Sequence, residues 1–271
     1  MTLYCERERI LGEDPIPKSY IDWAEKVIVK EEFFKLDCNS FVLKSAVFIT
    51  DQAKKRGYNG LVVGLSGGVD SAVVAALAAK TDIKTSVVTV VADGFIRKVD
   101  IDHATMISRH IGVPQEIIDI SGICRSICAM HLPGTHHIIM GIRNAIIKEI
   151  AENRNSLLIG TGNKTETYSG LFSANSYLGQ VFPLGSLFKS QVYQLAKFLM
   201  LPDYIIKKVS HGGVEGEKED KFLGMSSNVF DIAAAVCDGE NVTEVTVPQE
   251  LLEHIRRNKE NADIFFSFPD L

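Results

Sequence analysis

One glycine-rich loop carries the residue types that could do chemistry in this sequence. It consists of Gly64, Leu65, Ser66, Gly67, Gly68, Val69, Asp70 and Ser71. The two adjacent glycines have no Cβ, so their backbone can approach a phosphate closely and adopt dihedral angles closed to other residues. The hydroxyl groups of Ser66 and Ser71 can donate hydrogen bonds to phosphate oxygens, and the carboxylate of Asp70 can hold a divalent metal ion. These types and spacing predict a phosphate-binding loop.

The elements on either side of the loop must place it where anions bind. The apolar, β-branched run 61–65 predicts a buried parallel strand, and the helix formers of 71–80 follow the loop. At such a junction the carboxyl end of a strand meets the N-terminus of a helix, whose amides and dipole attract phosphates. A plain tight turn would explain Gly68 and an N-capping Ser71, but it would not explain the other residues of the loop.

The same alternation of strand and helix continues beyond the loop. Further strands are predicted at 85–91, 116–120 and 156–160, with helices near 101–111, 138–153 and 189–200. Four strands separated by helices predict an α/β fold, a doubly wound parallel sheet with flanking helices. We expect a single domain over 1–271, with a helical N-terminal segment at 1–58 and a C-terminal lid and tail at 210–271.

Composition narrows the class of protein. The chain has 271 residues, of which 46% are hydrophobic, so it can bury a sizeable core. Its formal charge of −5 gives no overall basic field of the kind that holds nucleic acid, and we expect no nucleic-acid partner. The 5 cysteines are odd in number and scattered, which suits a reduced cytosol. No signal peptide and no charge-free run of membrane-spanning length are apparent, so we expect a soluble, cytoplasmic protein without a membrane partner.

The loop differs from the phosphate loop of common ATPases, because no lysine follows its glycines. It resembles the Ser-Gly-Gly-x-Asp-Ser loop of the N-type ATP pyrophosphatases. That resemblance implies that ATP is split between its α- and β-phosphates and that a carboxylate is activated as its adenylate.

Two later segments indicate the branch of this superfamily. One is Gly160-Thr161-Gly162-Asn163-Lys164-Thr165-Glu166, and the other runs from Pro183 to Tyr193 and contains Lys189. Together with the loop they resemble the ammonia-dependent NAD synthetase family, over about 58–224. The resemblance implies an adenine nucleotide alpha hydrolase-like fold, a homodimer, and an ATP-dependent ligase that transfers free ammonia to the carboxylate of deamido-NAD, releasing AMP and pyrophosphate.

By matched positions, the resemblance also implies roles for individual residues. The loop Gly64–Ser71 would contact the ATP phosphates, as would Thr161, Lys189 and Ser210. Asp70 and Glu166 would hold magnesium, and Asp70, Lys189 and Thr161 would be the catalytic set. Each of three residues also has an explanation without a role in the site. Glu166 would be a solvated loop carboxylate, Lys189 an ordinary cation in the first turn of a helix, and Ser210 a plain loop serine.

The sequence departs from the family pattern on the side of the dinucleotide. The first of two family arginines falls on Gly141, and only the second, Arg143, is present. A family lysine falls on Ala174, a carboxylate becomes Phe222, and a His-Lys pair corresponds to Asn258-Lys259.

Three hypotheses remain at this point. The chain is a divergent NAD synthetase that uses Arg143, Lys148 or Lys259 for its dinucleotide; or it adenylates a different carboxylate; or it binds ATP without turnover.

Overall fold

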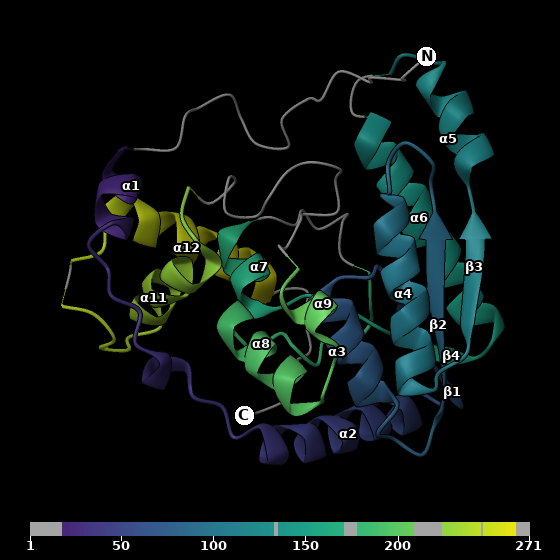
Figure 1. The fold of residues 1–271 in the computed structure, drawn as a ribbon, viewed down its shortest axis with the longest axis horizontal. Coiled ribbons are helices and arrows are strands. Elements are labelled where there is room, and N and C mark those ends of the chain that lie inside the picture. Colours follow the sequence, from purple (N-terminus) through teal and green to yellow (C-terminus); the bar gives the residue numbers. More distant parts are fainter. Residues whose placement is uncertain (1–17, 133–134, 171–177, 209–223, 245, 264–271) are drawn as a thin grey trace.

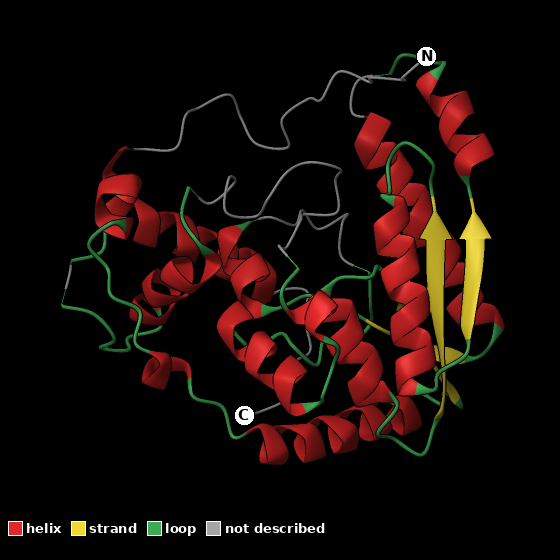
Figure 2. Ribbon diagram, in the orientation of Figure 1, coloured by secondary structure: helices red, strands yellow, loops and turns green. Residues whose placement is uncertain are grey.

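A four-stranded parallel sheet forms the core of the α/β part of the molecule. The computed structural model describes residues 18–132, 135–170, 178–208, 224–244 and 246–263. The strands are β1 (Gly60–Gly64), β2 (Lys84–Val91), β3 (Gln115–Asp119) and β4 (Ser156–Ile159). Their order in the sheet is β3-β2-β1-β4, and every neighbouring pair is parallel. The two arrows that are clearly visible in Figure 2, β2 and β3, lie side by side and point in the same direction. The four predicted strands are therefore confirmed, to within one or two residues at each end.

Both faces of the sheet are buried by helices. Alternate β1 residues point to opposite faces, so Leu61 and Val63 join one core cluster and Val62 joins another. The first face is covered by α3 (Val69–Ala78) and α4 (Lys98–Ile111). Three further helices of the same core pack against α3: α2 (Cys38–Lys55), α8 (Lys189–Phe198) and α9 (Asp203–Ile206). The second face is covered by α5 (Ser121–Cys128) and α6 (Thr135–Asn153). This arrangement confirms the doubly wound α/β class.

A third core lies apart from the sheet, among helices only. It is built from α1 (Lys18–Ala24), η1 (Glu31–Phe34), α7 (Lys164–Ser169), α11 (Ser227–Cys237) and α12 (Gln249–Asp263), which we call the helical cluster. Trp23, Phe230 and Ile255 are buried in its centre. Figure 1 shows α1, α11 and α12 on the side of the molecule away from the strands. Phe188, just before α8, packs into this core and so connects it to the sheet region.

Some helices have no counterpart in the sequence predictions. The segment after β4, for which no helix was predicted before 189, contains α7, which Asn163 caps and which ends at Gly170 with a φ of 73°. Glycine favours this left-handed helix stop because it has no Cβ. Helices α5 and α11 were also not predicted. Within the described residues, no helix combines the length and apolar character needed to cross a bilayer.

Candidate nucleotide-binding site

The glycine loop lies where the sequence predicts it, between the end of β1 at Gly64 and the first residue of α3. Gly67 has a φ of +76°, a left-handed conformation that side chains rarely adopt. A Cβ at this position would lie 2.1 Å from the carbonyl oxygen of Asp100 on α4. The loop therefore packs so closely against α4 that only glycine fits, which is a second reason for this residue beyond phosphate approach.

Two serines brace the loop from inside. The Oγ of Ser71 donates to the carbonyl oxygen of Gly68 at 3.0 Å and accepts from the backbone N–H of Ser66 at 3.2 Å. Its Oγ also lies 3.0 Å from the Oγ of Ser66, and Ser71 itself is buried. Ser66 is exposed. The hydroxyl of Ser66 is thus the one placed to meet a ligand, whereas Ser71 shapes the loop.

Apart from Asp70, the remaining loop residues offer backbone groups only. The side chains of Leu65 and Val69 are buried in the core, and the N–H of Leu65 donates to the carbonyl oxygen of Val88 at 2.8 Å. The first helical bond of α3 runs from the N–H of Ala72 to the carbonyl oxygen of Gly68. The amides of residues 69–71 precede it, so they have no acceptor within the helix and form an anion-binding helix end.

Asp70 and Lys189 form a buried ion pair across this helix end. The Lys189 Nζ lies 2.6 Å from Oδ2 of Asp70, with the two side chains 1% and 14% exposed. Asn163 Nδ2 donates to the other oxygen, Oδ1, at 2.8 Å. Lys189 occupies the first turn of α8, where the helix dipole disfavours a cation. A buried cation in that position needs a counter-charge, so Lys189 is not an ordinary helix-entry lysine.

Glu166 is buried, not solvated. Its Oε2 accepts the backbone N–H of Asn163 at 3.1 Å, and its own N–H donates to Oδ1 of Asn163 at 2.9 Å. This reciprocal pair is a capping box at the start of α7. Asn163 therefore contacts both predicted metal-binding carboxylates, Asp70 and Glu166.

Thr161 follows the end of β4 by two residues and is half-buried. Strands β1 and β4 are parallel neighbours with Val63 opposite Ile159, so Thr161 emerges at the same edge of the sheet as the loop. Ser210 lies outside the described residues. The structure thus brings Asp70, Lys189 and Glu166 together around Asn163 and places Thr161 at the adjoining strand end.

A buried carboxylate, Asp231 of α11, supports Lys189 from behind. It accepts hydrogen bonds from the hydroxyl of Thr165, from the Ser190 N–H at 3.2 Å and from the Ser190 Oγ at 3.0 Å. Thr165 Oγ1 in turn accepts the Lys189 N–H at 2.8 Å. Burial raises the pKa of Asp231 to about 6, although these hydrogen bonds and the charge of Lys189 oppose the shift.

Neither Asn163 nor Asp231 was among the predicted site residues. Asn163 carries a sequence signal, because Asn followed three residues later by Glu before a helix is a capping-box pattern. Asp231 carries no such signal, since it lies 66 residues from Thr165 in the chain.

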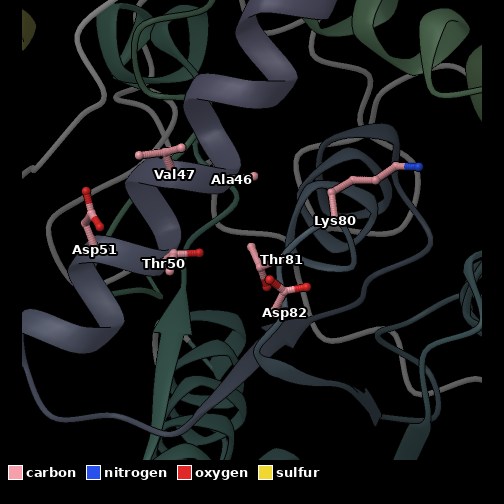
Figure 3. Close-up of a pocket in the computed structure, with 7 residues that line it drawn as sticks. All are labelled: Ala46, Val47, Thr50, Asp51, Lys80, Thr81 and Asp82. Carbon is pink, nitrogen blue, oxygen red and sulfur yellow. The ribbon is translucent and has the colours of Figure 1, made fainter.

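A separate shallow pocket of ≈ 240 Å³ lies near the far end of α3. It is lined by Ala46, Val47, Thr50, Asp51, Lys80, Thr81 and Asp82. Figure 3 shows Lys80 and Asp51 directed away from each other, so the polar groups do not converge on a common point. Helix α3 separates this pocket from the glycine loop, and we assign the pocket no part in the chemistry.

Comparison with known proteins identifies the family. The family described as NAD synthase matches residues 41–262. The chain belongs to the NAD synthase family. An NH(3)-dependent NAD(+) synthetase of Methanococcus aeolicus is 30% identical over 240 residues, covering 84% of this chain and 87% of that protein. One of Pyrococcus furiosus is 27% identical over 246 residues, covering 84% and 92%.

Solved structures share the fold of this family member. An NMN synthetase of Francisella tularensis superposes with a TM-score of 0.72 at 24% identity, covering 86% of this chain and 97% of that one. An NH3-dependent NAD synthetase of Campylobacter jejuni gives 0.68 at 24% identity, covering 87% and 99%. The adenine nucleotide alpha hydrolase-like class expected from the sequence is confirmed.

The positions that would face a dinucleotide are only partly described. Arg143 of α6 has an enclosed Nε that finds no hydrogen-bond partner among the described residues, and burial lowers its pKa. Gly141 is exposed, with open space where a Cβ would lie. Lys148 is exposed, with its Nζ 3.8 Å from Glu152. Ala174 and Phe222 lie outside the described residues.

The C-terminal candidate, Lys259, belongs to a charge cluster on the helical side. Its Nζ lies 2.6 Å from Asp238 Oδ1, and Lys164 Nζ lies 2.5 Å from the other oxygen. The Tyr168 hydroxyl also donates to Asp238, at 3.0 Å. Lys259 therefore has a protein counter-charge in this structure.

Proposed function

We propose that this chain is an ATP-dependent amide ligase that converts deamido-NAD to NAD with free ammonia, releasing AMP and pyrophosphate. The observation that carries the proposal is the glycine loop at the head of α3 with the Asp70–Lys189 pair across it. Membership of the NAD synthase family supports the substrate, and the curated relatives named above are NH(3)-dependent NAD(+) synthetases.

The reaction needs positioning and charge neutralisation rather than a side-chain nucleophile. A carboxylate oxygen of the substrate attacks the α-phosphorus of ATP, and the bond to the bridging oxygen breaks as pyrophosphate leaves. Ammonia then attacks the carbonyl carbon of the mixed anhydride, and AMP leaves with one carboxylate oxygen. The amides at the start of α3 and the Lys189 ammonium would stabilise the negative charge that develops on pyrophosphate.

The carboxylates of Asp70 and Glu166 fit a magnesium ion. Both supply hard oxygen atoms, and the hydrogen bonds from Asn163 hold the two side chains in place. The described residues contain no group of three or more metal-ligating side chains, which suits an ion that takes its remaining ligands from water and substrate phosphates. When bound, magnesium would neutralise charge on the triphosphate. We propose Asp70 and Glu166 as the residues that hold it, and Thr161, Lys189 and Ser210 as contacts to ATP.

The decisive experiment follows an oxygen isotope. Deamido-NAD labelled with ¹⁸O in its nicotinate carboxylate is incubated with ATP, magnesium and ammonia. We expect NAD and AMP in equal amounts, with one ¹⁸O atom in the phosphate of AMP. Label-free AMP, or ADP as the nucleotide product, would contradict adenylation of the carboxylate.

A panel of carboxylate substrates distinguishes deamido-NAD from other acids as the true substrate. Because one structural neighbour is an NMN synthetase, the panel includes the corresponding mononucleotide carboxylate alongside deamido-NAD. We expect the highest kcat/KM with deamido-NAD. Turnover of a different carboxylate only would reject the substrate but keep the chemistry, and ATP binding without AMP formation from any acid would reject catalysis.

Gly141 offers a direct test of the dinucleotide side. Gly141 is exposed, and no atom lies within 4 Å of the place where a Cβ would be, so a side chain can begin here without a clash. If the position faces the substrate, Gly141→Arg lowers the KM for deamido-NAD by about tenfold, the effect of one charged hydrogen bond. An unchanged KM would count against this alignment of the long helix α6.

We also propose a cytoplasmic homodimer. Exposed apolar side chains lie on α5, on α6 and in the turn between these neighbouring helices, which supports a covered face in solution. They are Ile123 of α5, Met130 and Leu132 of the turn, and Ile138 of α6. Light scattering after gel filtration should give twice the mass of the 271-residue chain. A monomer at micromolar concentration would contradict this.

A further inference from the structure

A lysine outside every predicted site holds the glycine loop. The Nζ of Lys208 donates to the carbonyl oxygen of Gly67 at 2.6 Å, and it also pairs with the carboxylate of Asp100. Asp100 is itself held by Arg97, whose Nε and Nη2 each donate at 2.9 Å. The side chains of Lys208 and Asp100 are only 14% and 17% exposed. A chain of contacts therefore runs from Arg97 through Asp100 and Lys208 to the centre of the loop.

The contact with Gly67 fixes the direction of one peptide plane. In a trans peptide the carbonyl and the following N–H point in opposite directions. With the Gly67 carbonyl directed to Lys208, the Gly68 N–H points the other way and donates to the Oγ of the exposed Ser66 at 3.3 Å. Glycine can adopt either orientation of this plane at little cost. The reverse orientation would present a carbonyl oxygen, instead of an N–H, to a bound phosphate.

We propose that Lys208 is a positioning residue for phosphate binding, which keeps the Gly67 carbonyl away from the anion and the Gly68 amide directed at it. This inference rests on the proposed function, because it requires the loop to bind the phosphates of ATP. The charge of Lys208 depends on its neighbours. Burial lowers the pKa of Lys208, and the hydrogen bond and charge of Asp100 oppose that shift.

A substitution of Asp100 distinguishes two possible roles of Lys208, which are positioning of the loop and direct contact with phosphate. If Lys208 acts through the Gly67 peptide, Asp100→Asn loosens the lysine and weakens phosphate binding. If Lys208 instead binds phosphate itself, removing its competing counter-charge strengthens binding. The two roles therefore predict opposite signs for the same variant.

The experiment measures binding of inorganic pyrophosphate with magnesium to the full chain by isothermal titration calorimetry. We expect Lys208→Met to weaken binding about tenfold or more, the effect of losing a charged hydrogen bond, and Lys208→Arg to stay within about threefold of wild type. The matched control is Lys207→Met. This neighbouring lysine is 76% exposed and pairs with Asp203, four residues before it, so its loss should leave binding unchanged.

Asp100→Asn should weaken pyrophosphate binding by about threefold to tenfold. Unchanged binding by a folded Lys208→Met variant, or tighter binding by Asp100→Asn, would overturn the proposal. Thermal melts check folding, and if Lys208→Met does not fold, Asp100→Asn provides the same test on its own. Wild-type protein that binds no pyrophosphate would overturn the proposed function itself, whereas equal binding by wild type and Lys208→Met would overturn only the role of Lys208.

Discussion

The glycine loop and the helical cluster both hold buried charges, but they hold them in different ways. Around the loop, Lys189 pairs with Asp70 and so joins α8 to the head of α3. Lys208 pairs with Asp100 of α4 and also donates to the Gly67 carbonyl in the loop. The amides at the start of that helix stay directed outward. In the helical cluster, the carboxylate of Asp238 collects Lys164, Lys259 and the Tyr168 hydroxyl, so charge is neutralised inside the protein.

This difference indicates separate roles for the two regions. Charges around the loop hold its backbone donors in place for the proposed phosphate, while the Asp238 group joins α7, α11 and α12 to one another. Changes near the loop should therefore impair ATP use, and changes around Asp238 should mainly reduce stability.

The largest effect should follow removal of the Lys189 ammonium. Lys189→Met deletes a buried charge beside the proposed phosphate site and leaves Asp70 without it, so we expect kcat to fall at least about 100-fold, as for loss of a preorganised donor. Steady-state pyrophosphate release measures it. Lys197→Met, an exposed lysine on the same helix, is the control. A loss below about fivefold would remove Lys189 from the chemistry.

Substitution of two glycines with the same φ of +76° distinguishes the cost of backbone strain from the cost of tight packing. Gly57 has open space around its missing Cβ, whereas a Cβ on Gly67 would meet the Asp100 carbonyl at 2.1 Å. We expect Gly57→Ala to destabilise by about 1 kcal/mol and Gly67→Ala by about 3 kcal/mol or more, with a weakened affinity for ATP only in the second variant. Urea unfolding and ATP titration check both effects. Equal destabilisation would show that the loop does not pack against α4 as described.

Asp231 connects the two regions, and its ionisation should appear in stability. Its pKa rises from 3.8 unfolded to about 6 in the folded protein, so between those values the folded state binds more protons. Stability contributed by this group therefore falls as the pH rises from about 4 to about 6, by up to about 3 kcal/mol, and is constant above that.

The measurement compares wild type with Asp231→Asn, because other groups titrate in the same range. The difference in unfolding free energy, wild type minus variant, should decrease across this window. A difference that stays flat from pH 4 to 6.5 would mean that Asp231 keeps an ordinary pKa.

A smaller effect is expected from Asp238→Asn. The substitution leaves Lys164 and Lys259 without their charged partner in a half-buried place, which should cost about 2 kcal/mol after allowance for solvent screening. The KM for ATP should stay within about threefold of wild type. A large rise in that KM with unchanged stability would reverse the roles assigned to the two regions.

Local patterns were sufficient to predict the sheet and the loop. Two β-branched runs and the alternation of strand and helix patterns after them predicted all four strands, and the loop Gly64–Ser71 is one continuous segment of the chain. Lys189 was named through a motif resemblance, yet its burial against Asp70 could not be predicted, because 119 residues separate the two in the chain.

The remaining site residues could not be predicted from local sequence, because only tertiary contacts bring them to the site. Lys208 and Gly67 are 141 residues apart, and nothing in the run before Val209 distinguishes Lys208 from the exposed Lys207 beside it. Helix α11 was not predicted, because short apolar runs do not distinguish a helix from a strand. Its Asp231, which is buried among mostly apolar residues, was therefore not predicted as a site residue either.

The central claim is that the loop Gly64–Ser71 binds the triphosphate of ATP at the head of α3. A crystal structure with magnesium and α,β-methylene-ATP tests it most directly. We predict phosphate oxygens within hydrogen-bond distance of the Gly68 amide and of the amides that begin α3, with Asp70 and Glu166 facing the metal. A triphosphate bound elsewhere, with this loop unchanged and Asp70 turned away from it, would contradict the account.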